Sequence, residues 1–291
     1  QDIYENYPND DIYLLTTKPY FELFKKNPYL KDVILDRRLS RFNLIYLYLL
    51  MRKIKKLNFI KFFDLQNSSR TSFYKKILLT NNDPKIWSSS NTTLPSQHSK
   101  EKFDKNPVLE RFEHQLKTSG LNTKHTLVPD FTWSCSDISN IKIKYNLDKY
   151  ILLFPFCSPH LSIKKWPFYN NLIKLIKEKY KDYYKIITAP GPSEIKDAEK
   201  FDAISILDNN KSIDVSQLSS LIKNSSFVIA NDTGPAHIAA HLNSKGLTLF
   251  GSHTTAEKVS IERENFKAIQ VADLKKLSVE KVFDKLSKAL S

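Results

Sequence analysis

Glycine, cysteine and long apolar runs are scarce in this sequence, and each scarcity narrows the class of protein. Only 5 of the 291 residues are Gly, so each Gly marks a place where the backbone needs freedom or room. Cys135 and Cys157 lie outside any CxxC motif and cannot build a disulfide framework or a Cys-rich metal site. The longest apolar run, residues 44–51, has eight residues, whereas a spanning helix needs about 20. We therefore expect a reducing compartment and no transmembrane segment; no signal peptide is visible.

Basic residues outnumber acidic ones throughout the chain. Lys and Arg total 45 against 31 Asp and Glu, a net charge of +14. Residues 1–133 carry +8 and residues 134–291 carry +6, so the excess is not confined to a tail. Such a charge favours polyanionic partners: nucleic acid, an anionic membrane face or phosphorylated substrates. From the sequence alone, a Lys-rich composition without functional cause, as in AT-biased genomes, explains the net positive charge equally well.

Strand-like and helix-like segments alternate along most of the chain, which predicts βαβ units and a parallel sheet, that is, an α/β fold. The expected strands are residues 11–16, 31–35, 59–65, 150–154, 185–189, 227–230 and 246–250. The expected helices are residues 19–26, 43–56, 108–118, 137–145, 166–180, 194–201, 215–223, 235–242 and 278–290. Residues 81–107, rich in Ser, Thr, Asn and Pro, are expected to form a loop or flap with little local structure.

The composition of these segments suggests two doubly wound domains. We place the first at residues 1–135, a linker at 136–148, the second domain at 149–277 and a closing helix at 278–291. Two such domains facing each other would bind a ligand in a central cleft at the carboxyl ends of their strands.

The strongest chemical signal is FVIANDTGPAHIAAH, residues 227–241, in which a buried strand runs into a turn and a helix. Gly234 allows close backbone approach or a positive φ, and the helix N-terminus offers N–H groups to a phosphate. Asp232, Thr233 and His237 add an acceptor, a hydroxyl and an imidazole at the same end. The alternative is plain N-capping with His237 in the core. His237 and His241 are four residues apart, but without HExxH or a Cys cluster we expect no metal site.

Two further loops follow expected strands. In FPFCSPHLSIKKWP, residues 154–167, Ser158 and Lys164 could contact a diphosphate at a helix entrance. In APGPSE, residues 189–194, Glu194 could bind ribose hydroxyls. Taken singly, the first loop is explained better as a solvated basic turn with Trp166 as a packing residue. Taken singly, Glu194 in the second loop is explained better as an ordinary first-turn acid that complements the helix dipole.

Together these loops resemble glycosyltransferase family 9, the bacterial ADP-heptose:lipopolysaccharide heptosyltransferases. The matching segments are Asp232-Thr233-Gly234-Pro235-x-His237-x-Ala239-Ala240, Leu249-Phe250-Gly251 with Thr254, Lys164-x-Trp166-Pro167, and the loop from Gly191 to Glu194. The N-terminal half matches more loosely, at Tyr7-Pro8, Asn27-Pro28, and Phe63-Asp64-Leu65-Gln66 with Arg70. Order and spacing agree over nearly the whole chain, although Gly251-Ser252-His253 replaces the family's usual Gly-Pro-Thr.

The resemblance implies a GT-B fold, with an N-terminal acceptor-side domain and a nucleotide-sugar-binding domain at 149–277. It implies that Ser158, Lys164, Glu194, Asp232, Thr233, Gly234 and His237 bind the donor, with Lys164 also stabilising the leaving group. The family's first strand and its Gly-Asp turn, which carries the proposed catalytic base, have no counterpart here. We therefore expect the base to lie before Gln1 and leave the catalytic residue unassigned.

The resemblance also implies the partners. The donor would be an ADP-sugar, with no tightly bound cofactor and no metal indicated, and transfer of heptose or a related sugar would invert the anomeric centre. The acceptor would be an anionic, lipid-linked glycan such as the lipopolysaccharide core. The enzyme would be cytoplasmic, free or peripheral at the inner membrane face. The net positive charge suits such a face, which Arg37, Arg38, Arg41 and residues 52–56, around the apolar stripe of residues 43–56, could contact. The alternative, which the sequence favours, is a sheet-covering helix with a basic, solvated face. A catalytically inactive nucleotide-sugar-binding module stays open. A nucleic-acid-binding protein is disfavoured, because no basic aromatic stripe or helix-turn-helix is present.

Overall fold

The computed structural model describes residues 1–79 and 86–291, which form two compact units, 1–129 and 130–291. Within the expected loop at 81–107, residues 81–85 lie outside the described residues. The rest of that loop contains a short strand and a short helix, so it is more structured than expected. Among the described residues, no helix is both long and apolar enough to cross a bilayer.

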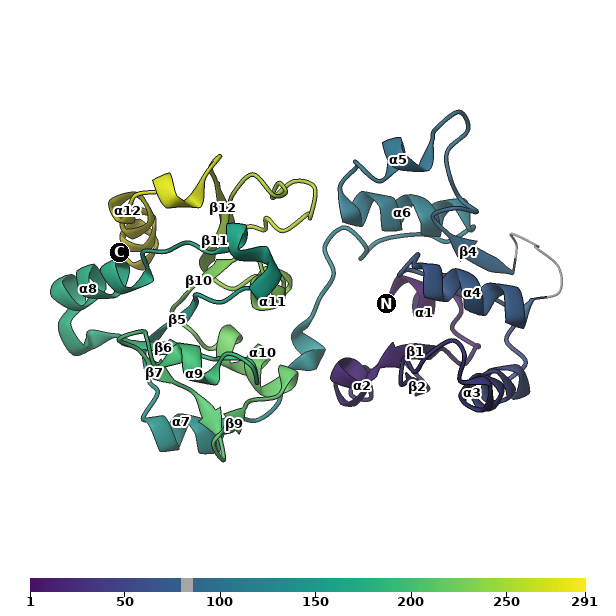
Figure 1. The fold of residues 1–291 in the computed structure, drawn as a ribbon, viewed down its shortest axis with the longest axis horizontal. Coiled ribbons are helices and arrows are strands. Elements are labelled where there is room, and N and C mark those ends of the chain that lie inside the picture. Colours follow the sequence, from purple (N-terminus) through teal and green to yellow (C-terminus); the bar gives the residue numbers. More distant parts are fainter. Residues whose placement is uncertain (80–85) are drawn as a thin grey trace. The chain divides into compact units, whose positions relative to one another are not determined.

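The first unit contains short parallel strand pairs covered by helices (Figure 1). Strands β1 and β2 pair in parallel, and so do β3 and β4. Its small core forms where α3 and α4 bury Leu47, Met51 and Tyr74 together with Ile34. The elements are α1 (Asp2–Asn6), β1 (Tyr13–Thr17), α2 (Lys18–Phe24), β2 (Asp32–Asp36), α3 (Leu44–Lys56), β3 (Phe62–Asp64), α4 (Ser69–Leu78), β4 (Trp87–Ser89), α5 (Lys100–Phe103) and α6 (Val108–Thr118).

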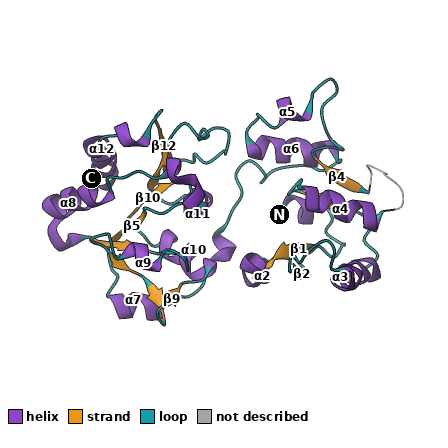
Figure 2. Cartoon of the chain, viewed as in Figure 1, coloured by secondary structure: helices purple, strands orange, loops and turns teal. Residues whose placement is uncertain are grey.

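The second unit is a doubly wound α/β domain. Its helices are α7 (Ser139–Tyr145), α8 (Tyr169–Tyr180), α9 (Ile195–Ala198), α10 (Val215–Lys223), α11 (Gly234–His241) and α12 (Val279–Leu290). Its strands are β5 (Tyr150–Phe154), β6 (Lys185–Thr188), β7 (Ile204–Ser205), β8 (Leu207–Asp208), β9 (Lys211–Ser212), β10 (Phe227–Asn231), β11 (Gly246–Phe250) and β12 (Phe266–Gln270). Figure 2 shows these strands in orange with helices around them.

Six strands form one parallel sheet in the order β12-β11-β10-β5-β6-β7. The chain starts at the centre with β5, moves outward through β6 and β7, and then returns to β10 beside β5 before moving outward on the other side. The order therefore reverses between β5 and β10. In open α/β sheets, ligands bind outside the carboxyl ends of the strands at such a switch point.

Both faces of this sheet are buried, as the continuous apolar strands predict. On one face, Leu152 and Val228 pack with α10 and α11. On the other, Ile151 and Ile229 pack with α8 and α12, which lie side by side (Figure 1). The alternation along β5 thus sends neighbouring side chains to opposite cores.

Local signals place several helices well. Asp214 caps α10 in a capping box with Gln217, and Ser278 caps α12. The helix expected at 166–180 begins later, at Tyr169. The reason is tertiary: the indole of Trp166 is fully buried and donates to the carbonyl of Leu277, and the Trp166 backbone N–H donates to Asn231.

The boundary between the units lies between Pro129 and Asp130, not at residue 135. Residues 136–148, expected as a linker, instead contribute Ile138, Ile141 and Leu147 to the core of the second unit. The apolar residues of this segment are buried there because α7 covers one face of the sheet.

Candidate functional site

A pocket of about 390 Å³ lies at the switch point of the second unit. Its walls come from loops that follow three neighbouring strands, β5, β6 and β10. All seven residues expected to bind a donor line it, together with three others; the ten are Cys157, Ser158, Leu161, Lys164, Glu194, Asp232, Thr233, Gly234, Pro235 and His237. The structure therefore brings together residues up to 80 positions apart in sequence, from Cys157 to His237.

The first wall is the β5 corner, residues 155–165. After β5 the chain forms a 3₁₀ segment, Pro159–Lys164, that ends at Lys164. The buried Asn231 fixes this corner: its amide donates to the carbonyl of Phe156, and its side-chain oxygen accepts from the Trp166 N–H at 3.2 Å. The β5 corner is thus tied to the end of β10.

The second wall is the β10 corner, residues 231–237. Thr233 has extended backbone and precedes α11, and Pro235 stands in the first turn, where a missing N–H costs nothing. The N-terminal turn of α11 therefore opens into the pocket. Aligned peptide dipoles make this end of a helix favourable for anions.

Asp232 is the electrostatic centre of the pocket. It is 5% exposed, and its carboxylate contacts Lys164 Nζ at 2.6 Å, His253 Nε2 at 3.0 Å and His237 Nε2 at 3.4 Å. Burial alone would raise the pKa of Asp232, but the hydrogen bonds from His237, Lys164 and His253 and the charge of Lys164 outweigh it. The pKa is held well below its usual range, so Asp232 is ionised and holds three nitrogen donors around its carboxylate.

Glu194 lies on the third wall as the N-cap of α9. Its Oε2 accepts a hydrogen bond from the Gly191 N–H at 2.8 Å, which closes the loop after β6. Burial raises the pKa of Glu194, although the Gly191 N–H opposes that shift. The carboxylate is therefore partly desolvated and is held against the Gly191 backbone in the lining of the pocket.

Three residues that shape the site were not among those predicted from the sequence. His253 comes from the loop after β11, stacks on Phe250 and contacts Asp232; its position in Gly251-Ser252-His253, where the family pattern has Gly-Pro-Thr, was the available signal. The second residue is Asn231, and its place beside Asp232 at the end of a buried strand was the available signal. Cys157 gave no signal, since a lone cysteine in a loop has no characteristic spacing.

The two histidines that lie four residues apart have different partners: His237 contacts Asp232, whereas His241 faces Arg263. His241 Nδ1 lies 3.3 Å from the Arg263 guanidinium, and burial, Arg263 and His237 lower the pKa of His241 to about 4. Within the described ranges, one His and carboxylate group could hold an ion: Asp2, Glu5 and His125 of the first unit. There Asp2 already accepts backbone N–H bonds from residues 124–126, so the group ties α1 to that segment.

Gly234 is used for room rather than for a positive φ. A Cβ added there would meet no atom within 4 Å, so we expect Gly234→Ala to change the free energy of unfolding by less than about 1 kcal/mol. Filling the space beside the N-terminus of α11 should nevertheless weaken ADP binding about tenfold or more. Calorimetric titration and urea unfolding measure the two effects separately.

Gly246→Ala is the contrasting variant. Its Cβ would lie 2.6 Å from the carbonyl oxygen of Val228 and 2.8 Å from the ring of Phe266, so this change should destabilise the fold. Equal loss of stability in both variants would show that Gly234 serves packing and not a ligand.

Comparison with known proteins gives a consistent result. The family model described as glycosyltransferase family 9 (heptosyltransferase) matches residues 50–286. A search of curated proteins found no match.

Three solved structures share the fold at low sequence identity. E. coli ADP-heptose lps heptosyltransferase II is 14% identical with a TM-score of 0.70, covering 99% of this chain and 92% of that one. E. coli heptosyltransferase WaaC with ADP is 16% identical with a TM-score of 0.70, and the match covers 99% of this chain and 93% of that one. The family 9 glycosyl transferase from Veillonella parvula is 14% identical with a TM-score of 0.76, and the match covers 97% of this chain and 89% of that one. The chain has the GT-B fold of these proteins.

Proposed function

Since the chain belongs to glycosyltransferase family 9, we propose that it transfers a heptose or related sugar from an ADP-sugar to a lipopolysaccharide core or another surface glycan, with inversion. The family resemblance found in the sequence is thereby confirmed, and the donor, acceptor and stereochemistry are the proposal. The two cysteines are free thiols, which fits a cytoplasmic location for the reaction.

One observation carries the proposal: the loops after β5, β6 and β10 converge on a single pocket that contains every residue expected to hold the donor. The residues suit the parts of a nucleotide sugar. The α11 N-terminus and Lys164 suit a diphosphate, and Glu194 suits ribose hydroxyls. WaaC structures with ADP and with ADP-2-deoxy-2-fluoro heptose show that relatives of this fold bind such molecules.

The Lys164–Asp232 pair gives the pocket its chemistry. The ammonium has three N–H donors, and Asp232 holds it in place through one of them. The remaining donors can bind diphosphate oxygens as the bond to the anomeric carbon breaks and negative charge builds on the leaving ADP. His237, on the first turns of α11, also lines the pocket. No residue of the pocket is assigned as the base that deprotonates the acceptor.

The proposal is tested by incubating the protein with ADP-heptose and a lipopolysaccharide-core acceptor. Mass spectrometry should detect the glycosylated acceptor together with released ADP, and NMR should show an inverted anomeric centre. ADP binding without product would instead support the nucleotide-sugar-binding module. Failure to bind ADP would reject both functions.

Cys157 provides a reporter for occupancy of the pocket. Burial raises the pKa of its thiol, so alkylation by iodoacetamide should be slow at neutral pH and faster in mildly alkaline buffer. We expect ADP to slow alkylation of Cys157 severalfold, measured by peptide mass spectrometry. Cys135, which packs against the sheet core away from the pocket lining, serves as the internal control. Equal protection of both thiols would indicate a global stability effect.

A further inference from the structure

The outer face of α3, in the first unit, is apolar where a surface helix is normally polar. Leu44, Ile45, Tyr48 and Leu49 are 73%, 75%, 64% and 56% exposed, and Phe42, just before the helix, is 92% exposed. The opposite face of α3 is buried in the core of the unit. Both faces of the first half of α3 are thus apolar, so packing within the unit leaves one of them uncovered.

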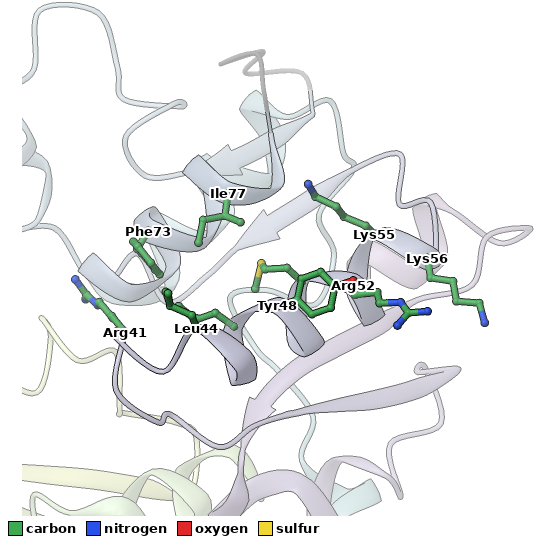
Figure 3. A pocket seen from close by; sticks show the side chains of 10 residues that line it. Arg41, Leu44, Tyr48, Arg52, Lys55, Lys56, Phe73 and Ile77 are labelled. Atoms are coloured by element: carbon green, nitrogen blue, oxygen red, sulfur yellow. The ribbon is translucent and has the colours of Figure 1, made fainter.

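A groove of about 800 Å³ runs beside this face, between α3 and α4 (Figure 3). Leu44 and Tyr48 line it from α3, and Phe73 and Ile77 line it from α4. Arg41 lies at one end of the groove. Its guanidinium donates a hydrogen bond to Ser69 Oγ at 2.9 Å and lies over the ring of Phe73. The exposed apolar surface is therefore continuous and contains a hollow large enough for hydrocarbon chains.

The charge around this surface has one sign. Residues 37–63 contain no Asp or Glu; their basic residues are Arg37, Arg38, Arg41, Arg52, Lys53, Lys55, Lys56 and Lys61. Along α3 the two properties are separated: apolar side chains occupy the exposed face of the first half, and Arg52, Lys55 and Lys56 occupy the last turns. Within the described part of the chain, no ion pair involves these three cations.

We propose that α3 is an interfacial helix that docks on a bilayer containing anionic phospholipid. Phe42, Leu44, Ile45, Tyr48 and Leu49 would enter the boundary of the acyl chains, and the basic side chains would contact lipid phosphates. A second copy of the chain fits less well, because pairing this face with itself would bring the two basic clusters together. Nucleic acid fits less well because the exposed side chains of Leu44, Ile45 and Leu49 offer nothing to a phosphate backbone. None of these residues lines the candidate site in the second unit, so the inference stands apart from the proposed function.

Vesicle co-sedimentation of the whole chain tests the proposal directly. We expect binding to mixed phosphatidylcholine and phosphatidylglycerol vesicles, weak binding to phosphatidylcholine alone, and a decrease as salt rises. The variant Ile45→Ser/Leu49→Ser should weaken binding about tenfold or more, because it removes apolar area that the bilayer would bury. The variant Arg52→Glu/Lys55→Glu should do the same by reversing charge near the lipid surface.

Matched controls change the same chemistry elsewhere. Ile143→Ser removes an apolar side chain that is 77% exposed on α7, and Lys275→Glu/Lys285→Glu reverses two exposed charges of the second unit. Neither control should alter vesicle binding. Thermal unfolding and ADP titration confirm that each variant stays folded.

A tryptophan reporter locates the contact. Tyr48→Trp should show a blue-shifted emission with anionic vesicles and quenching by brominated lipid, measured against the same protein without vesicles. Three results would overturn the proposal: vesicle binding that the α3 variants leave unchanged, a dimer in solution that Ile45→Ser/Leu49→Ser dissociates, or binding to random DNA tighter than to the vesicles.

Discussion

Replacing Lys164 by Ala is expected to weaken ADP binding about a hundredfold, which corresponds to about 2.8 kcal/mol. Lys164 is the one ammonium among the described residues that line the pocket. Its side chain is 21% exposed, and its Nζ lies 2.6 Å from the Asp232 carboxylate, so little conformational entropy is lost when it binds an anion. The loss should be much smaller for adenosine, which has no diphosphate. Isothermal titration of both ligands into both proteins measures the difference.

Lys165→Ala is the matched control for this experiment. It removes the same charge from the neighbouring residue, which is exposed and does not line the pocket. We expect it to change ADP affinity by less than about threefold, through long-range electrostatics alone. If the two alanine variants lost affinity equally, the diphosphate would be attracted by the general positive charge and not by the Lys164–Asp232 pair.

Replacing Asp232 by Asn is expected to lower the free energy of unfolding by about 2 kcal/mol at neutral pH. The change keeps the shape of the side chain but removes the charge that Lys164, His237 and His253 surround. Lys164 can then turn toward solvent, so the penalty is smaller than for a fully buried ion pair. The exposed pair of Asp197, on α9, with Lys200, just after that helix, gives the control: Asp197→Asn removes this surface contact and should change stability little.

The effect of Asp232→Asn should depend on pH with a defined sign. The pKa of Asp232 is lower in the folded state than the ordinary value, so its stabilisation is fully present above the unfolded pKa of about 3.9. It is lost as pH falls below that value toward the folded pKa. Urea unfolding from neutral pH downward should therefore show the difference between wild type and variant shrinking below about pH 4. A difference that stays constant in acid would mean that the Asp232 charge does not stabilise the fold.

Much of the second unit could be predicted because its signals are local. The apolar runs of β5 and β11 and the N-caps Asp214 and Ser278 mark elements that the structure confirms. The turn from β10 into α11 was also visible, because Gly and Pro there have specific backbone consequences. These features depend on residues that are close in sequence.

Other contacts and elements could not be predicted, because no pattern of neighbouring residues in the sequence indicates them. The ion pair of Lys164 with Asp232 joins residues 68 positions apart, and His253 reaches the same carboxylate from a third loop. Strand β12 has exposed residues at two of its five positions and was missed, as was α4, whose apolar pattern is weak. Strands β7 to β9 have two residues each, too few for any periodic pattern.

On this account the β5 corner and the β10 corner bind the diphosphate of one nucleotide together. Backbone hydrogen exchange, followed by mass spectrometry with and without ADP, tests it at both corners in a single measurement. We expect ADP to slow exchange in residues 157–165 and in the first turn of α11, with no change in α12 or in the first unit. Slowing at only one corner, or only outside the second unit, would contradict the account.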